Sequence, residues 1–224
     1  VSERIKLPVF VRTTTKVSHS SGVVELGSIV KSPNRARYEK DVDRYYLGDV
    51  TAQKRHEWQR KQMRALPKIL RSLKMSPLSI KKEQKLGVIA SGGAYNYAAD
   101  AIRDLGLKEK MATLKVETAH PLPEEKMKAL LQRTKKVLVI EELEPFMENQ
   151  LRELAYELPG RQCAEIHGRR TGAVPEATEL NYEIVASSLR RLVGIRVTQD
   201  EREVAIRQEI ARVVPPRGWT LCAG

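Results

Sequence analysis

From residue 86 onward, short apolar runs alternate with stretches of helical period, and this alternation constrains the fold more than any other feature. A run of five or six apolar residues has the length of a buried strand, whereas apolar residues three or four apart mark one face of a helix. Strands that alternate with single helices are best joined by right-handed crossovers, which give a parallel sheet with helices on both faces. We therefore predict a three-layer α/β domain. Its strands are expected near residues 86–91, 112–117 and 136–140, with a possible fourth at 163–167.

Helix boundaries are also visible in the pattern. Gly106 follows the first helical stretch, as glycine often does at a helix end. Glu144 and Pro145 open a later helix with negative charge at its N-terminus, where the helix dipole favours it. The helices are expected over residues 94–105, around 127–131, from 144 to 155, from 180 to 193 and from about 200 to 214.

The first 30 residues do not belong to this alternating unit. Leu7–Val11 is apolar like a buried strand but has no partner strand nearby in the sequence, so it is expected to be the last strand of a domain that begins upstream. Residues 31–85 are polar and basic, with helix predicted around 51–74. We divide the chain into a domain tail at 1–30, a basic linker at 31–85, the α/β domain at 86–195 and a connector at 196–224.

The net charge of +12 is concentrated in the first part of the chain. Residues 1–85 hold 20 Lys and Arg against 8 Asp and Glu, whereas residues 86–224 hold 20 against 20. The excess positive charge is therefore a property of the linker and not of the α/β domain. It leaves a nucleic-acid-binding arm at 31–85 open as an alternative function. No run approaches the roughly 18 apolar residues of a membrane span, and two cysteines do not make a disulfide framework. We expect a soluble protein of the reducing cytoplasm.

Ser91, Gly92 and Gly93 follow the first predicted strand and open a helix. Backbone N–H groups at such a position can hold an anion, and ligands of parallel sheets gather at the carboxyl ends of strands. The G-x-G-x-x-G spacing of a dinucleotide site is absent, and a tight turn explains the two glycines equally well.

A hydroxyl-rich stretch after Leu7–Val11 is the second candidate anion site. Arg12, Thr14 and His19, together with the hydroxyls between them, could hold an anionic substrate or a phosphate. Hydroxyl side chains also cap helices and close turns, which is the alternative interpretation.

Other polar residues are more simply explained by structure. Glu141, Glu142 and Glu144 could be paired carboxylates, but a cluster at a helix start is the plainer interpretation. His120 lies in a proline turn. Cys163 and His167 have no further Cys or His nearby, which makes zinc unfavourable, and no Walker loop, nucleophile elbow or metalloprotease helix occurs. No catalytic residue is assigned.

Four stretches, in this order, resemble the large (alpha) subunit of indolepyruvate ferredoxin oxidoreductase, in the thiamine-diphosphate-dependent 2-oxoacid:ferredoxin oxidoreductase superfamily. They cover nearly the whole chain. The stretches are residues 8–19 (PVFVRTTTKVSH), 86–97 (LGVIASGGAYNY), 118–123 (TAHPLP) and 137–145 (VLVIEELEP).

The resemblance implies where this chain belongs in a longer enzyme. Residues 1–30 would be the tail of the pyrimidine-binding domain, and residues 86–195 would resemble the C-terminal domain of transketolase. Residues 196–224 would lead into the thiamine-diphosphate-binding domain, which starts with a Cys-x-Gly-Cys motif in this family. Cys222 is therefore a candidate metal or cluster ligand, and the natural protein is expected to continue with a cysteine after Gly224.

The resemblance also implies the reaction and its participants. Such enzymes convert an aryl pyruvate and coenzyme A into an acyl-coenzyme A and carbon dioxide, and ferredoxin receives the electrons. Thiamine diphosphate with magnesium and 4Fe-4S clusters would serve the full-length enzyme, which has a smaller (beta) subunit as partner. The Gly-Asp-Gly motif of the diphosphate site does not occur here, so no cofactor is expected on this chain alone and the chain by itself is expected to be inactive.

Overall fold

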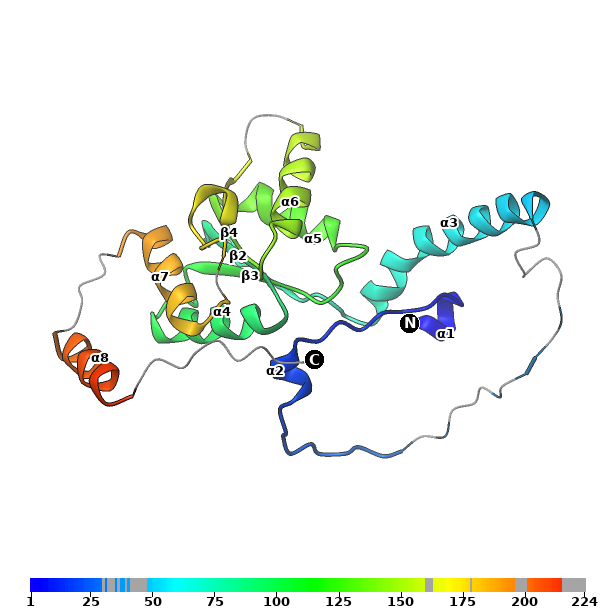
Figure 1. Cartoon of the computed structure of the whole chain (residues 1–224). Helices are drawn as coiled ribbons and strands as arrows, with labels where there is room; N and C mark the ends of the chain where they lie inside the picture. Colours follow the sequence, from blue (N-terminus) through cyan, green and yellow to red (C-terminus); the bar gives the residue numbers. More distant parts are fainter. Residues whose placement is uncertain are drawn as a thin grey trace. The chain divides into compact units, whose positions relative to one another are not determined.

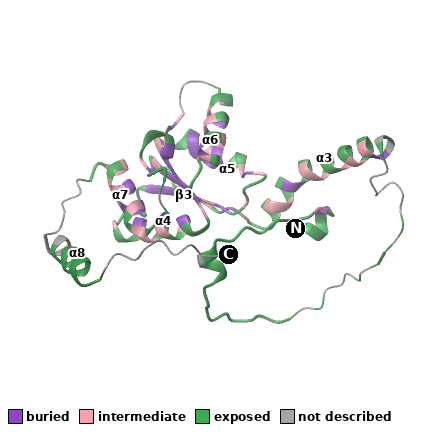
Figure 2. Cartoon of the chain, viewed as in Figure 1, coloured by how far each residue is buried: buried purple, intermediate pink, exposed green. Residues whose placement is uncertain are grey.

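The computed structural model describes residues 1–29, 31, 35, 37–38, 40, 48–159, 163–177, 179–195 and 201–214. Its contacts form two compact units, one containing Val1–Ile69 and the other Leu70–Val213 (Figure 1). The second unit holds the sheet, and it contains most of the buried side chains (Figure 2).

The first unit contains three helices among its described residues: α1 (Ser2–Ile5), α2 (Thr15–Ser18) and the 24-residue α3 (Asp49–Ser72), which continues past Ile69. Helix α3 confirms the helix predicted around 51–74. The strand predicted at Leu7–Val11 is wrong, because Pro8–Val11 forms no strand and Phe10 is 92% exposed. A strand is stable only when its backbone groups pair with a neighbour, and no described residues pair with this segment.

The second unit is built on a five-stranded sheet with the order β1-β3-β2-β4-β5. Strands β2 to β5 are parallel, and only β1 runs antiparallel, beside β3. The predicted central strands are confirmed, with the second starting one residue earlier, and the possible fourth strand is present but short. Strand β1 was not predicted, because it has only two residues. The strands are β1 (Leu78–Ser79), β2 (Leu86–Ser91), β3 (Met111–Val116), β4 (Lys136–Ile140) and β5 (Glu165–His167).

Helices cover both faces of the sheet, as predicted (Figure 1). On one face, Val88 and Ala90 of β2 pack with residues of α4 (Gly92–Asp104) and α7 (Tyr182–Val193). On the other face, Ile89 packs with residues of α5 (Glu124–Arg133) and α6 (Phe146–Glu157). Successive residues of a strand point to opposite faces, so a fully apolar strand such as β2 serves both layers.

The remaining elements complete the second unit. A short 3-10 helix, η2 (Arg169–Thr171), follows β5, and α8 (Glu201–Val213) follows α7. Gly106 follows α4, as the sequence predicts, and Gly194 caps α7; both have positive φ. Among the described residues, no helix combines the length and apolar character needed to cross a bilayer.

Candidate functional site

The carboxyl ends of β2 and β4 are neighbours at the centre of the sheet. Ala90 pairs with Ile140 in the last register position of these strands, so Ser91 and Glu141 follow at the same edge. This edge is where parallel sheets place their ligands. The sequence predicted Ser91 for such a site and offered Glu141 only as one of a carboxylate cluster.

The turn Ser91-Gly92-Gly93 leaves the start of α4 open. Ser91 makes no side-chain hydrogen bond to the helix it precedes, and both glycines are exposed. Gly92 has φ of +53°, a conformation that favours glycine, so the tight turn accounts for this residue. Gly93 does not have a positive φ, and a Cβ added there would meet nothing within 4 Å. The first N–H groups of α4 are therefore accessible to an anion, and no crowding explains Gly93.

Glu141 caps the start of α6. Its carboxylate accepts hydrogen bonds from Met147 N at 2.7 Å and from Glu148 N at 2.9 Å. The residue is 5% exposed, and burial raises the pKa of this carboxyl while the two backbone N–H groups oppose the rise. The helix-start interpretation is confirmed for Glu141, whereas Glu142 accepts from Leu180 N at 3.2 Å.

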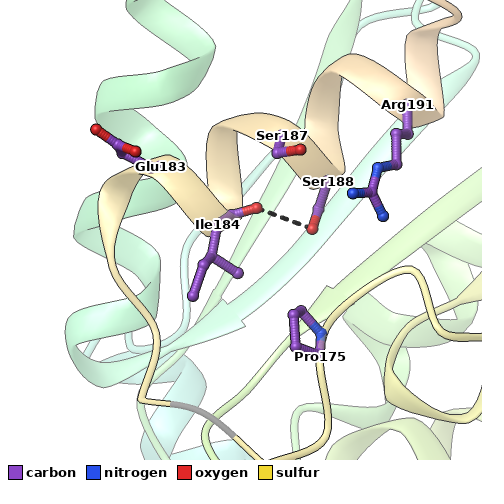
Figure 3. A pocket seen from close by; sticks show the side chains of 6 residues that line it. All are labelled: Pro175, Glu183, Ile184, Ser187, Ser188 and Arg191. Carbon is purple, nitrogen blue, oxygen red and sulfur yellow. Dashed lines mark hydrogen bonds between the residues drawn. The ribbon is translucent and has the colours of Figure 1, made fainter. Parts of the chain in front are cut away.

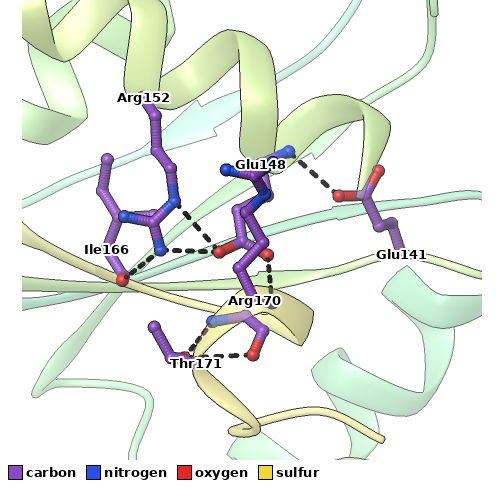
Figure 4. A network of polar contacts seen from close by, with 7 residues as sticks. Glu141, Glu148, Arg152, Ile166, Arg170 and Thr171 are labelled. Carbon is purple, nitrogen blue, oxygen red and sulfur yellow. Dashed lines mark hydrogen bonds and ion pairs between the residues drawn. The ribbon is translucent and has the colours of Figure 1, made fainter. Parts of the chain in front are cut away.

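A partly buried ion pair adjoins this cap (Figure 4). Glu148 is fully buried, and its Oε1 accepts from Arg152 Nη2 at 2.6 Å and from Arg152 Nε at 3.2 Å. Its Oε2 accepts from Arg170 N at 3.1 Å, and Arg152 Nη2 also donates to Ile166 O at 2.9 Å. The pair therefore ties α6 to β5 and η2. A Cβ added at Gly168 would lie 2.4 Å from Glu148 Oε2, so only glycine fits beside this carboxylate.

Arg169 is a second buried charge beside the end of β4. It is 1% exposed, and its Nε donates to Glu141 O at 2.9 Å while its Nη1 donates to Pro175 O. Its Nη2 has no hydrogen-bond partner among the described residues. The guanidinium holds the loop after η2 against the end of β4, so its visible contacts are structural.

Glu148, Arg152 and Arg169 were not predicted from the sequence. Glu148 and Arg152 stand four residues apart on one helix, which is the spacing of a helical ion pair and could have drawn attention to them. No comparable local signal exists for Arg169, because its acceptors lie on two other segments.

The predicted stretch that begins at Arg12 contains the short helix α2. Thr14 caps it, with Oγ1 accepting from Val17 N at 3.4 Å, and Thr13 Oγ1 lies 2.8 Å from Ser18 Oγ. These contacts agree with the capping interpretation of the hydroxyls. Arg12 and His19 are exposed. Within the described part of the chain, no hydrogen bond or ion pair joins Arg12, Thr14 and His19 to one another.

Two shallow hollows lie along α7. The larger has a volume of about 250 Å³ and is lined in part by Ile184, Ser188 and Arg191 (Figure 3). The smaller, about 130 Å³, shares Ser188 and Arg191 and is also lined by His167. None of the predicted anion-site residues lines either hollow.

Metal-binding groups are not assembled in this part of the chain. Within the described ranges, no three His, Cys, Asp or Glu residues lie close enough to hold an ion. Burial raises the pKa of the Cys163 thiol, which opposes thiolate formation. Cys222 lies outside the described residues. These residues therefore do not fit a resident magnesium ion or cluster.

Comparison with known proteins identifies the family. Residues 78–214 match the indolepyruvate ferredoxin oxidoreductase middle domain. The chain belongs to this family. The resemblance inferred from the four stretches is thereby confirmed.

Relatives extend the match over the whole chain. The indolepyruvate oxidoreductase subunit IorA of Methanothermobacter thermautotrophicus is 34% identical over 228 residues, which cover 100% of this chain and 35% of the relative. The IorA subunit of Archaeoglobus fulgidus is 31% identical, with 100% and 35% covered, and that of Thermococcus kodakarensis is 30% identical, with 99% and 34% covered. The chain thus spans about a third of the length of these curated relatives.

Two solved structures are similar at low identity. One is a split-gene transketolase, an inactive beta4 tetramer, with 16% identity and a TM-score of 0.40 over 54% of this chain and 42% of that chain. The other is 2-oxoglutarate:ferredoxin oxidoreductase from Magnetococcus marinus with 2-oxoglutarate, coenzyme A and succinyl-CoA bound. It has 14% identity and a TM-score of 0.47 over 66% of this chain and 24% of that chain. The assignment to the family rests on the middle-domain match and on the sequence relatives, and not on these two structures.

Proposed function

We propose that this chain is part of an enzyme that oxidises an indolepyruvate-like 2-oxoacid. The overall reaction joins the acyl group of an aryl pyruvate to coenzyme A, releases carbon dioxide and passes two electrons, one at a time, to ferredoxin. The observation that carries the proposal is the similarity of the entire chain to IorA subunits at up to 34% identity. A smaller subunit is the expected partner in the complete enzyme.

Within that enzyme, we assign residues 70–213 a mainly structural role. The buried charges near the carboxyl ends of the strands are used internally: Glu141 caps α6, Glu148 pairs with Arg152, and Arg169 holds backbone carbonyls. A charge so engaged is not available for proton transfer without breaking those bonds. This supports a scaffold that fixes the edge of the sheet.

The cofactors are assigned to parts of the enzyme outside this chain. In enzymes of this kind, thiamine diphosphate with magnesium supplies the nucleophile and electron sink for decarboxylation, and 4Fe-4S clusters carry single electrons. Because the described residues do not fit a metal centre, no step of the chemistry is assigned to them.

Two places on this chain remain our candidates for contact with an anionic group of a substrate or coenzyme. The better one is the open turn Ser91-Gly92-Gly93, since its helix start has no side-chain cap. The second is the stretch holding Arg12, Thr14 and His19, of which Arg12 and His19 are exposed.

The test uses the complete polypeptide purified with its smaller subunit. Indolepyruvate and coenzyme A together should support reduction of methyl viologen, and omission of either should stop it. Pyruvate and 2-oxoglutarate serve as matched substrates. Faster turnover of either than of indolepyruvate would contradict the aryl-pyruvate assignment, and inactivity with all three would contradict the oxidoreductase assignment.

A further inference from the structure

Four cations between residues 60 and 68 share one exposed face of α3, and Arg71 follows on the same face. At 100° per residue they fall within an arc of about 100° around the helix. Less exposed residues, including Trp58 and Leu66, lie on the other side. We call the four cations the basic stripe. They are Arg60, Lys61, Arg64 and Lys68, all exposed.

Within the part of the chain that the structure describes, no carboxylate neutralises the basic stripe by an ion pair. None of its members takes part in an ion pair there, whereas Lys81, Arg103 and Lys128 of the second unit all do. Glu57, one turn before the stripe, accepts a hydrogen bond from Gln53 at 3.0 Å.

The spacing of the stripe makes this lack of a partner costly. Arg60, Arg64 and Lys68 follow one another at intervals of four residues, so each lies directly above the next on the helix surface. Like charges at that spacing repel one another and destabilise a helix. A negatively charged partner would be attracted to these cations, and its binding would relieve their mutual repulsion.

The chemistry of the stripe also indicates what kind of partner it fits. Permanent subunit interfaces are large and apolar, whereas transient electron-transfer encounters are small and guided by complementary charge. The stripe consists of charged side chains and spans nine residues of helix, a rise of about 12 Å. It is therefore suited to a transient, acidic protein partner.

We propose that the basic stripe of α3 is a docking surface for the ferredoxin that accepts the enzyme's electrons. This inference rests on the proposed function, which supplies the need for an iron–sulfur partner. A cluster held by four thiolates carries net negative charge, since thiolate and sulfide charges exceed those of the irons. A protein that carries such a cluster brings negative charge to its docking face, complementary to the four cations.

The test is a charge reversal in the complete enzyme with its smaller subunit. The stripe variant carries Arg60→Glu, Lys61→Glu and Arg64→Glu. The control variant carries the same change of charge at Lys108, Lys110 and Arg133, which are also exposed and lack an ion pair among the described residues. Both are assayed with ferredoxin and with methyl viologen. Methyl viologen is a small cation, so it does not bind the basic stripe and can accept electrons without docking there.

We expect the stripe variant to raise the KM for ferredoxin at least tenfold at low ionic strength, because electrostatic steering changes association rates by about 10–1000-fold. Its rate with methyl viologen should stay within twofold of the unmodified enzyme. Salt should raise the KM of the unmodified enzyme steeply and that of the stripe variant little. If the glutamate variant fails to fold, the glutamine variant at the same three positions replaces it, with a smaller rise in KM expected.

Several outcomes would overturn the inference. They are an unchanged KM for ferredoxin, an equal rise in the control variant, or loss of the smaller subunit from the purified stripe variant. Loss of salt-sensitive retention on a nucleic-acid column, with the KM for ferredoxin unchanged, would instead favour the nucleic-acid arm. Inactivity of the unmodified enzyme with both acceptors would overturn the proposed function itself and this inference with it. Activity with viologen but no effect of the stripe would overturn the docking surface alone.

Discussion

The substitution Gly168→Ala should destabilise the sheet domain through one contact. The added Cβ would lie 2.4 Å from Glu148 Oε2 and 2.7 Å from Glu148 Cδ, distances that real Cβ atoms do not adopt. Gly168 has φ of 179°, an extended conformation open to any residue, so the backbone itself adds no strain. The expected loss is therefore steric and local.

The size of the loss follows from how tightly Glu148 is held. The carboxylate is fully buried and bound by Arg152 and by Arg170 N, so it cannot retreat from the new methyl group without losing charged hydrogen bonds. Overpacking costs about 1–3 kcal/mol, and a hydrogen bond to a charged group contributes about 1.5–3 kcal/mol. We expect a loss of about 3 kcal/mol in the free energy of unfolding, or a fall in Tm of roughly 10 °C for a domain of this size.

Urea unfolding of the chain, followed by circular dichroism, measures this loss. Gly93→Ala is the matched control, because a Cβ at Gly93 meets nothing within 4 Å. It should change the stability little or raise it slightly. In a double-mutant cycle, Gly168→Ala should cost much less in a Glu148→Ala background, since the clash is then gone. An equal cost in both backgrounds, or a cost below about 0.5 kcal/mol in the unmodified chain, would refute the steric reasoning.

Three further predictions test other parts of the structure. Glu117 Oε2 accepts from the N–H of buried Ser76 at 2.9 Å, and this backbone hydrogen bond, with help from Lys115, lowers the pKa of the Glu117 carboxyl. A lowered pKa means stability that is present above the ordinary value near 4.5 and lost as the pH falls through the folded value. Glu117→Ala should therefore cost about 1–2 kcal/mol at pH 7 and progressively less as the pH falls through the folded pKa, as measured by urea unfolding; a pH-independent cost would contradict this. Gly93→Asp should raise the KM for an anionic substrate or coenzyme in the complete enzyme while Gly93→Asn does not, with no loss of stability because Asp suits a helix start; equal kinetics of the two variants would count against an anion at the turn. The 224-residue chain alone should neither bind thiamine diphosphate by calorimetry nor turn over indolepyruvate, and measurable turnover with cofactor, coenzyme A and an acceptor supplied would disprove the scaffold assignment.

The central architecture could be predicted because its signal is local in the sequence. Strands β2 and β4 are short apolar runs buried on both faces, and α4 carries its buried alanines at helical spacing. The open turn at Ser91 was likewise visible, since it joins two elements that the periodicity identifies. Apolar residues on the buried face of a helix or strand recur at the period of that element, so one stretch of sequence is enough to predict the element and its buried face.

The features that the sequence did not reveal depend on contacts between distant segments. Strand β1 is two residues long and exists only because it pairs with β3, while Leu7–Val11 has strand-like residues and no partner strand among the described residues. Gly168 looks like any loop glycine until Glu148, twenty residues earlier, is placed against it. Side-chain period and capping are properties of neighbouring residues, so the sequence alone determined the layers and the helix ends. Strand pairing and buried charge require groups brought together from different elements, so only the tertiary structure decided which charges are engaged and which, like the basic stripe, are left facing outward.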